Sequence, residues 1–483
     1  MLLAKFKSLF GAQDMTVGNP LAVMMKFSLP LLFGNIAQLT YNIVNARILG
    51  TMVSPLALGA VGVSMPIQNL FFVFFMTVGA GISIVVAQYF GAKKKEDLSN
   101  SIGSSIVLTL FTTLGIAALG IPLSGAILNL TNVNEDIFDL ARQYLSIMFA
   151  GAIGVGFYNV LSGILRGMGD TMFPLIVLIF TSVLNIILNL IFVGALDMGV
   201  GGSAFATVLA QTLSAIICMH RLLKMKDTID ISRNTLRPKK RYVKEILRIG
   251  LPAGVQQTVL TMASVFVQAF VNGIMVLDAR GVMTSAIFAI SAATHTQVEA
   301  LAMLPKQAFS LGGSTFAGQN IGAGQMDRVK QGFRIILATS MIMAIALFLI
   351  IYFFGGHLAR FFIDQADVNA GVIVYWSVYI QRIMIWNFFF TALIQATTGI
   401  IRGAGDTMAV MVITIICTVA LRVPMAYIWV TLGRNELNPG GDPAGIYWSM
   451  VICTGIAAAM CIGYYISGSW KRRAVVTAGS SPK

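Results

Sequence analysis

Long apolar stretches recur along the 483-residue chain, and short polar breaks separate them. A helix of about 20 mostly apolar residues crosses the hydrocarbon core of a bilayer. The pattern predicts twelve such helices, at residues 27–48, 57–88, 99–123, 138–164, 173–196, 201–223, 245–275, 282–317, 330–354, 370–398, 408–432 and 444–467. The longest polar break follows the sixth. We therefore expect an N-lobe at 1–224, a cytoplasmic linker at 225–244 and a C-lobe at 245–483.

Two short phrases occur twice, once in each half of the chain. Residues 163–172 read Gly-Ile-Leu-Arg-Gly-Met-Gly-Asp-Thr-Met, and residues 399–408 repeat them with two changes. The phrase at 88–92 similarly resembles 319–323. Both pairs fall at equivalent places in the six-plus-six pattern, which predicts two homologous lobes. We expect the Arg-Gly-x-Gly-Asp-Thr loops to be structural: the glycines allow a tight turn and the Asp-Thr pair caps the next helix.

Composition and charge agree with a membrane protein. Hydrophobic residues make up 57% of the chain and charged residues only 11%, against about 25% charged residues in soluble domains. Most of the 33 Lys and Arg residues fall in alternate connections, and the positive-inside rule places those connections and both termini in the cytoplasm of an inner-membrane protein. The basic run 237–241 fits this topology better than a nucleic-acid partner. No Gly-rich nucleotide-binding phrase occurs, so transport energy must come from an ion gradient or from the substrate's own gradient.

Several further phrases along the chain look familiar. They are Phe-Ser-Leu-Pro-Leu-Leu at 27–32, Tyr-Asn-Ile-Val at 41–44, Val-Ala-Gln-Tyr-Phe-Gly at 86–91, Leu-Ser-Gly-Ile-Leu-Arg-Gly at 161–167, Ser-Val-Leu-Asn-Ile-Ile-Leu at 182–188, Gly-Gln-Asn-Ile-Gly-Ala-Gly at 318–324 and Arg-Val-Pro-Met-Ala-Tyr at 422–427. In this order they resemble the multidrug and toxic compound extrusion (MATE) family, close to its DinF-like bacterial branch. The resemblance implies an all-α membrane protein with twelve transmembrane helices in two six-helix lobes around a central cavity.

The N-lobe departs from the family pattern at its acidic positions. Asn45 and Asn189 stand where the resemblance leads us to expect aspartates that take part in cation coupling. An amide takes up no proton and offers Na⁺ only a neutral oxygen. We expect the polar side chains of this lobe either to line the cavity or to join helices by hydrogen bonds. The residues concerned are Gln38, Tyr41, Asn42, Asn45, Asn185 and Asn189.

The C-lobe keeps ionisable residues inside a predicted span. His295, Glu299 and Lys306 follow one another at steps of four and seven and so share one helix face. Ionisable residues inside membrane spans are costly and usually functional. Glu299 also matches the family's glutamate before an Ala-Met-x-Pro phrase, a position that the resemblance ties to cation or substrate binding. A structural Glu299–Lys306 pair at the Pro305 bend is the alternative.

Together with these observations, the resemblance to the MATE family implies a secondary active exporter of organic cations or amphiphiles, coupled to H⁺ or Na⁺ and working by alternating access. Coupling candidates are Glu299, His295 and Lys306, and Gln256 and Met303 are expected to line the C-lobe cavity. The alternatives are an uncoupled facilitator, an exporter of anionic or zwitterionic substrates, a lipid-linked-oligosaccharide flippase, and a membrane scaffold or receptor. We expect a monomer whose partners are a small-molecule substrate and membrane lipid, with no cofactor beyond the ion and no metal site or enzymatic constellation.

Overall fold

The computed structural model describes residues 12–131, 133–364, 366–434 and 441–476, and these form two compact units. The first unit runs to Gly254 and adds Gly318–Met326 and the chain from Ala474 onward. The second comprises Val255–Ala317 and Asp327–Arg473. Two long helices, α9 (Lys240–Gly273) and α10 (Ala286–Gly322), pass from one unit into the other. The lobe boundaries expected from the sequence follow the internal duplication, whereas these two units follow the contacts within the structure. The lobe boundaries therefore stay a prediction.

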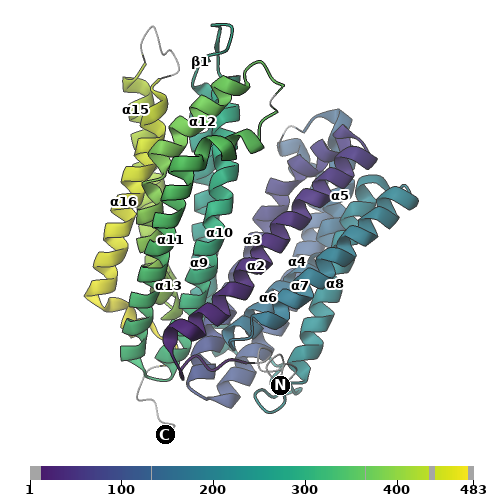
Figure 1. Cartoon of the computed structure of the whole chain (residues 1–483). Helices are drawn as coiled ribbons and strands as arrows, with labels where there is room; N and C mark the ends of the chain where they lie inside the picture. Colours follow the sequence, from purple (N-terminus) through teal and green to yellow (C-terminus); the bar gives the residue numbers. More distant parts are fainter. Residues whose placement is uncertain (1–11, 132, 365, 435–440, 477–483) are drawn as a thin grey trace, which may run out of the picture. The chain divides into compact units, whose positions relative to one another are not determined.

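The first unit is a bundle of long helices that run alongside one another (Figure 1). Besides its share of α9 and α10 it contains α2 (Pro20–Met52), α3 (Pro55–Gly91), α4 (Lys95–Leu130), α5 (Glu135–Ala150), α6 (Ala152–Gly167), α7 (Met172–Asn189), the π-helix η1 (Leu190–Ala195) and α8 (Gly199–Leu223).

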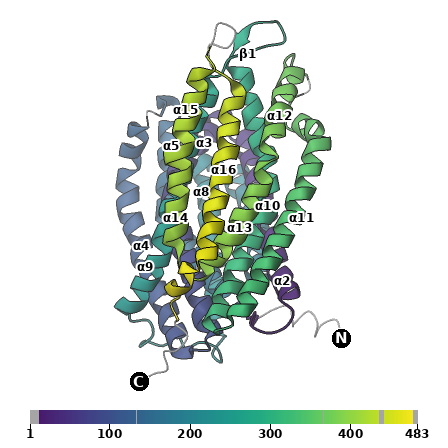
Figure 2. The same ribbon diagram turned by 90° about the vertical axis from the view of Figure 1, so that its left-hand side faces the viewer.

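The second unit is helical apart from one short hairpin between α9 and α10. Figure 2 shows α16 running beside α14 and α15 in this unit. Its elements are β1 (Val276–Leu277), β2 (Met283–Thr284), α11 (Met326–Phe361), α12 (Ala370–Met384), α13 (Asn387–Gly403), α14 (Thr407–Ile415), the π-helix η2 (Ile416–Arg422), α15 (Val423–Leu432), α16 (Pro443–Ser467) and the 3₁₀-helix η3 (Ser469–Arg473).

Every predicted span corresponds to a helix or a bent helix pair. The described part of the chain has 10 helices long and apolar enough to cross a membrane, or up to 12 when each bent pair is one span. The bends have equivalent places in the two repeats, since α5 and α6 meet at 50° and α12 and α13 at 47°. The spans that follow also agree, because each contains a π-helix, η1 or η2. The predicted duplication is thus visible in helix geometry as well as in sequence.

The repeated Arg-Gly-x-Gly-Asp-Thr loops have the structural role predicted for them. Gly169 and Gly405 adopt left-handed φ angles of +88° and +86°, which glycine tolerates without strain. After each turn an aspartate caps the next helix, because Asp170 Oδ1 accepts from the Phe173 amide at 3.1 Å and Asp406 Oδ1 from the Ala409 amide at 3.4 Å.

Asp170 lies outside the spans and is buried, with its other carboxylate oxygen 3.5 Å from Arg221 Nη2. Burial raises the pKa of the Asp170 carboxyl, and the Phe173 amide and the Arg221 charge offset part of that rise.

The two Gln…Gly-Ala phrases cross each other in the first unit. A Cβ atom on Gly91 of α3 would lie 1.9 Å from the Gln319 carbonyl oxygen, and one on Gly322 of α10 would lie 2.0 Å from the Gln88 carbonyl oxygen. The two helices therefore touch backbone to backbone, as glycine allows where helices pack closely in membranes. The glutamines are fully buried and each holds one end of the chain. Gln319 Oε1 accepts from the Met15 amide at 2.8 Å, and Gln88 Oε1 accepts from the Val475 amide at 2.7 Å.

The segment after α8 is packed along the first turns of α4. Lys95 Nζ donates to the carbonyl oxygens of Lys226 and Asp227, and the Asp230 amide donates to Ser99 Oγ at 2.9 Å. Two of the basic connections expected on the cytoplasmic side therefore lie at the same end of the first unit. The chain ends, 1–11 and 477–483, lie outside the described residues.

Candidate functional site

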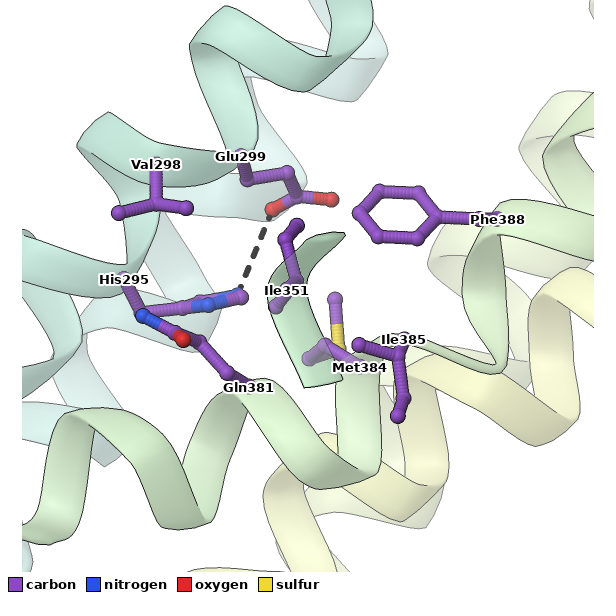
Figure 3. Close-up of a pocket in the computed structure, with 8 residues that line it drawn as sticks. All are labelled: His295, Val298, Glu299, Ile351, Gln381, Met384, Ile385 and Phe388. Atoms are coloured by element: carbon purple, nitrogen blue, oxygen red, sulfur yellow. Dashed lines mark ion pairs between the residues drawn. The ribbon is translucent and has the colours of Figure 1, made fainter. Parts of the chain in front are cut away.

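A pocket opens in the second unit where α10, α11, α12 and α13 meet (Figure 3). It encloses about 220 Å³ of empty space, its open mouth included. Most of its wall is apolar, and three polar side chains interrupt that wall. The lining residues are His295, Val298, Glu299, Ile351, Gln381, Met384, Ile385 and Phe388.

The structure brings His295 and Glu299 together in this pocket, as their spacing on α10 predicts. The His295 Nε2 atom lies 3.6 Å from Glu299 Oε2, one helical turn further along (Figure 3). His295 is 5% exposed, and its ring meets the Tyr447 ring edge-on at 6.1 Å. At 3.6 Å the two groups form no hydrogen bond, but they attract each other when both are charged, and the acid can hold a proton or a cation. Their role as coupling groups stays a prediction.

Lys306 lies on the same helix but outside the pocket lining. Its side chain is fully buried, and Nζ donates to Thr391 Oγ1 of α13 at 2.9 Å. The ammonium also lies 4.0 Å from the centre of the Phe388 ring. Among the described residues no ion pair joins Lys306 to Glu299, so the structural pair considered for the Pro305 bend is not formed here. Helix α10 runs unbroken through Pro305.

Arg422 adds a second basic side chain near Glu299. It ends the π-helix η2, and its charge and that of Glu299 are close enough to interact. Its Nε atom is buried without a hydrogen-bond partner. Such a residue in a π-helical turn is typical of functional positions, because the widened turn redirects a side chain.

Sequence reasoning missed Gln381 and Asn387. Gln381 is 2% exposed, lines the pocket, and neither amide atom has a hydrogen-bond partner. Asn387, buried at the start of α13, likewise leaves its Oδ1 unsatisfied. Both lie inside the predicted span 370–398, so their polarity within an apolar stretch was the available signal.

Gln256 and Met303 were expected to line a cavity of the C-lobe, and neither lines this pocket. Gln256 is held on both sides, since its Nε2 donates to Thr414 Oγ1 at 2.8 Å and its Oε1 accepts from Arg402 Nη2 at 3.0 Å. Met303 is half-buried and packs against the apolar cluster that includes Phe388. The contacts of Gln256 favour a structural function in this conformation, and the cavity role of both residues stays a prediction.

In the first unit the three asparagines form one network. Asn45 Nδ2 of α2 donates to Asn185 Oδ1 of α7 at 2.8 Å, and Asn189 Nδ2 donates to the same oxygen at 3.1 Å. Asn185 Nδ2 reaches Thr207 Oγ1 of α8 at 3.4 Å, so three helices are joined. Asn189 is fully buried and its Oδ1 has no partner.

The other polar side chains predicted for the N-lobe cavity lie apart from this network. Gln38 and Asn42 on α2 are exposed, and Tyr41 is half-buried. The network itself has the geometry of an interhelical joint, the alternative that the sequence left open beside cavity lining.

Comparison with protein families gives a match over most of the chain. The model of the MatE family matches residues 30–191 and 256–428, which fall in both repeats. The chain belongs to the MatE family. This confirms the resemblance seen in the sequence, and it makes the protein a multi-pass membrane protein of a transporter family.

Individual MatE-type proteins match nearly end to end. The probable multidrug resistance protein YpnP of Bacillus subtilis (strain 168) is 28% identical over 471 residues, which cover 96% of this chain and 99% of that protein. A multidrug resistance MATE transporter solved in an outward-facing conformation superimposes with a TM-score of 0.84 at 24% identity, covering 96% of this chain and 99% of that chain. These structures confirm the twelve-helix, two-lobe fold class.

A third similar protein is a MOP superfamily transporter from Pyrococcus furiosus. Its binding pocket has been described as having a reverse polarity that suggests a different function. The similarity is 24% identity and a TM-score of 0.84, covering 95% of this chain and 97% of that chain.

Proposed function

We propose that this MatE-family chain is a secondary active multidrug exporter that works by alternating access and is coupled to an H⁺ or Na⁺ gradient. Its similarity to YpnP, named a probable multidrug resistance protein, supports the transport of more than one drug. Duplicated halves of this kind suit alternating access, because one half can rock against the other around a site near the midplane. The protein resides in the inner membrane as a monomer, with both termini in the cytoplasm.

Glu299 is the coupling group in this proposal, and the observation that carries it is the Glu299–His295 pair inside a mostly apolar pocket. A carboxylate in an apolar wall is stable when it holds a proton or a cation and costly when it stands alone. His295, 3.6 Å away, supplies a proton-accepting nitrogen. If the ion is Na⁺, the oxygens of Glu299 and of the unpartnered Gln381 amide are the ligands that the pocket offers.

The first unit contributes no charge change in this proposal. Its Asn45–Asn185–Asn189 network contains only amides, which keep their protonation state across the physiological pH range. Coupling therefore falls to the pocket of the second unit. In this proposal the protein uses no resident cofactor. Its partners are the coupling ion, the substrate and membrane lipid.

The test is transport of a fluorescent amphiphile in proteoliposomes under imposed pH and Na⁺ gradients. Wild type is compared with Glu299→Gln, and with Asp327→Asn as a matched control. Asp327 is an exposed carboxylate paired with Lys330 on the surface of α11, and such surface pairs contribute little to stability. We expect a gradient to drive uphill movement in wild type and in the control, and only downhill movement in Glu299→Gln.

Movement that is only downhill in wild type, and equal under either gradient, would replace the exporter with an uncoupled facilitator. Uphill movement that survives in Glu299→Gln would move the coupling away from this pocket.

A further inference from the structure

The charges around the pocket of the second unit do not balance. One carboxylate, Glu299, is surrounded by His295 at 3.6 Å and by the charges of Lys306 and Arg422, which are near enough to interact with it. Even with a neutral imidazole, two basic side chains stand against one acid. A surplus positive charge inside a membrane protein is costly unless an anion offsets it.

Lys306 is the group least compensated by the protein. Its side chain is fully buried, and its contacts are a hydroxyl, Thr391 Oγ1 at 2.9 Å, and an aromatic face, Phe388 at 4.0 Å. An ammonium has three N–H donors, and neither contact carries a negative charge. Within the described part of the chain no carboxylate lies at ion-pair distance from Nζ.

The place of Phe388 links this lysine to the pocket. Phe388 lines the pocket (Figure 3). Lys306 lies against the Phe388 ring and is not one of the lining residues. The ammonium therefore stands directly behind one wall of the cavity. At such separations in an apolar interior a unit charge strongly favours an opposite charge in the cavity.

The pocket also offers unused hydrogen-bond donors. The Gln381 amide nitrogen and the His295 ring are buried without hydrogen-bond partners, and a neutral imidazole supplies one N–H donor. Carboxylate, phosphate and sulfonate groups accept several hydrogen bonds at once, so they would satisfy these donors and the surplus charge together. An organic cation would satisfy neither.

We propose that this pocket binds the acidic group of the transported substrate, with Lys306 as its counter-charge, so that the substrates are anionic or zwitterionic amphiphiles rather than simple organic cations. The apolar side chains of Val298, Ile351, Met384 and Ile385 contact the part of such a molecule that adjoins its acidic group. The inference rests on the proposed export function and names its substrate class.

The experiment uses two dyes with the same xanthene skeleton and opposite charge, carboxyfluorescein and rhodamine 6G. Binding to the purified full-length protein is measured by fluorescence anisotropy in detergent, and transport is measured in proteoliposomes. The variants are Lys306→Met, which keeps chain length without charge, and Lys306→Arg, which keeps the charge. The control is Lys330→Met, because Lys330 is an exposed lysine on α11.

We expect wild type to prefer carboxyfluorescein. Lys306→Met should weaken carboxyfluorescein binding about tenfold or more, since the counter-charge beside the cavity is lost. Lys306→Arg should retain most of the preference, and Lys330→Met should match wild type. Thr391→Val removes the hydroxyl that orients Nζ and serves as the second variant should Lys306→Met fail to fold. It should reduce the preference for carboxyfluorescein over rhodamine 6G.

A wild-type preference for rhodamine 6G in the binding assay would overturn the assignment, as would equal carboxyfluorescein affinity in wild type and Lys306→Met. Because binding is read without any gradient, this result is separate from the export function. If carboxyfluorescein binds through Lys306 but no gradient drives either dye, the substrate class stands and the exporter mechanism falls.

Discussion

The crossing of α3 and α10 makes a sharp prediction for Gly91→Ala. The added Cβ would lie 1.9 Å from the Gln319 carbonyl oxygen and 2.6 Å from its carbonyl carbon, whereas ordinary contact begins at 3.4 Å. The obstacle is backbone inside the last turn of a helix, so it cannot rotate away. The two helices must separate, and that separation also weakens the hydrogen bonds that the Gln88 and Gln319 side chains accept.

Gly62→Ala is the matched control on the same helix, because a Cβ there meets no atom within 4 Å. Replacing an unhindered helical glycine by alanine stabilises a helix by roughly 0.5–1 kcal/mol, and overpacking destabilises by about 1–3 kcal/mol or more. We therefore expect the two variants to differ by on the order of 3 kcal/mol, with Gly91→Ala the less stable. The assay is thermal unfolding of the purified protein in detergent, followed by intrinsic fluorescence.

The reciprocal variant sharpens the test. Gly322→Ala places its Cβ 2.0 Å from the Gln88 carbonyl oxygen, so its loss of stability should resemble that of Gly91→Ala. The double variant should lose much less than the sum of both, because helices already forced apart leave room for the second methyl group. A Gly91→Ala protein as stable as Gly62→Ala, or strict additivity in the double variant, would refute the backbone contact.

Two further predictions concern the first unit. Asn185→Leu should lower the free energy of unfolding by about 1 kcal/mol or more, because Asn45 and Asn189 lose the oxygen that both donate to. The control is Asn42→Leu, at an exposed position of the same helix as Asn45. Equal unfolding midpoints for the two variants would contradict the network. Asp170 has a pKa raised by burial, so the folded state binds its proton more tightly than the unfolded state does. Its contribution to stability is then full below the ordinary carboxyl pKa and is lost as pH rises through the folded value. Asp170→Asn should flatten the fall of the unfolding midpoint as pH rises above the ordinary carboxyl pKa of about 4, and an unchanged slope would count against the burial effect.

The helices were predictable because their signal is long and redundant. Each span carries about 20 apolar residues, and the two repeats checked one another, so all twelve positions agree with the structure. The loops at Asp170 and Asp406 were predictable for another reason: glycine conformation and aspartate capping are local and need no tertiary information. The bends between paired helices were not predicted, since the 50° turn at Gly151 depends on packing against other helices.

The pocket was predictable only along one helix. Spacing placed His295 beside Glu299, because residues four apart share a face of α10. It could not show that Gln381 would come from α12, or that Lys306 would turn toward Thr391 instead of Glu299. Contacts between helices far apart in sequence depend on tertiary packing, which a single sequence does not encode in any local pattern.

The glycine crossing has a consequence for how the two copies of this duplicated chain could diverge. At Gly91 and Gly322 each copy presses its backbone on the other, so a side chain gained by either one is resisted by its counterpart. Neither glycine can therefore be replaced by a larger residue without moving the other helix. At their polar sites the copies differ: one holds an all-amide network at Asn45 and Asn185, and the other a charged pocket at Glu299. The backbone contact at Gly91 and Gly322 therefore constrains both copies in the same way, whereas the polar residues of each copy differ.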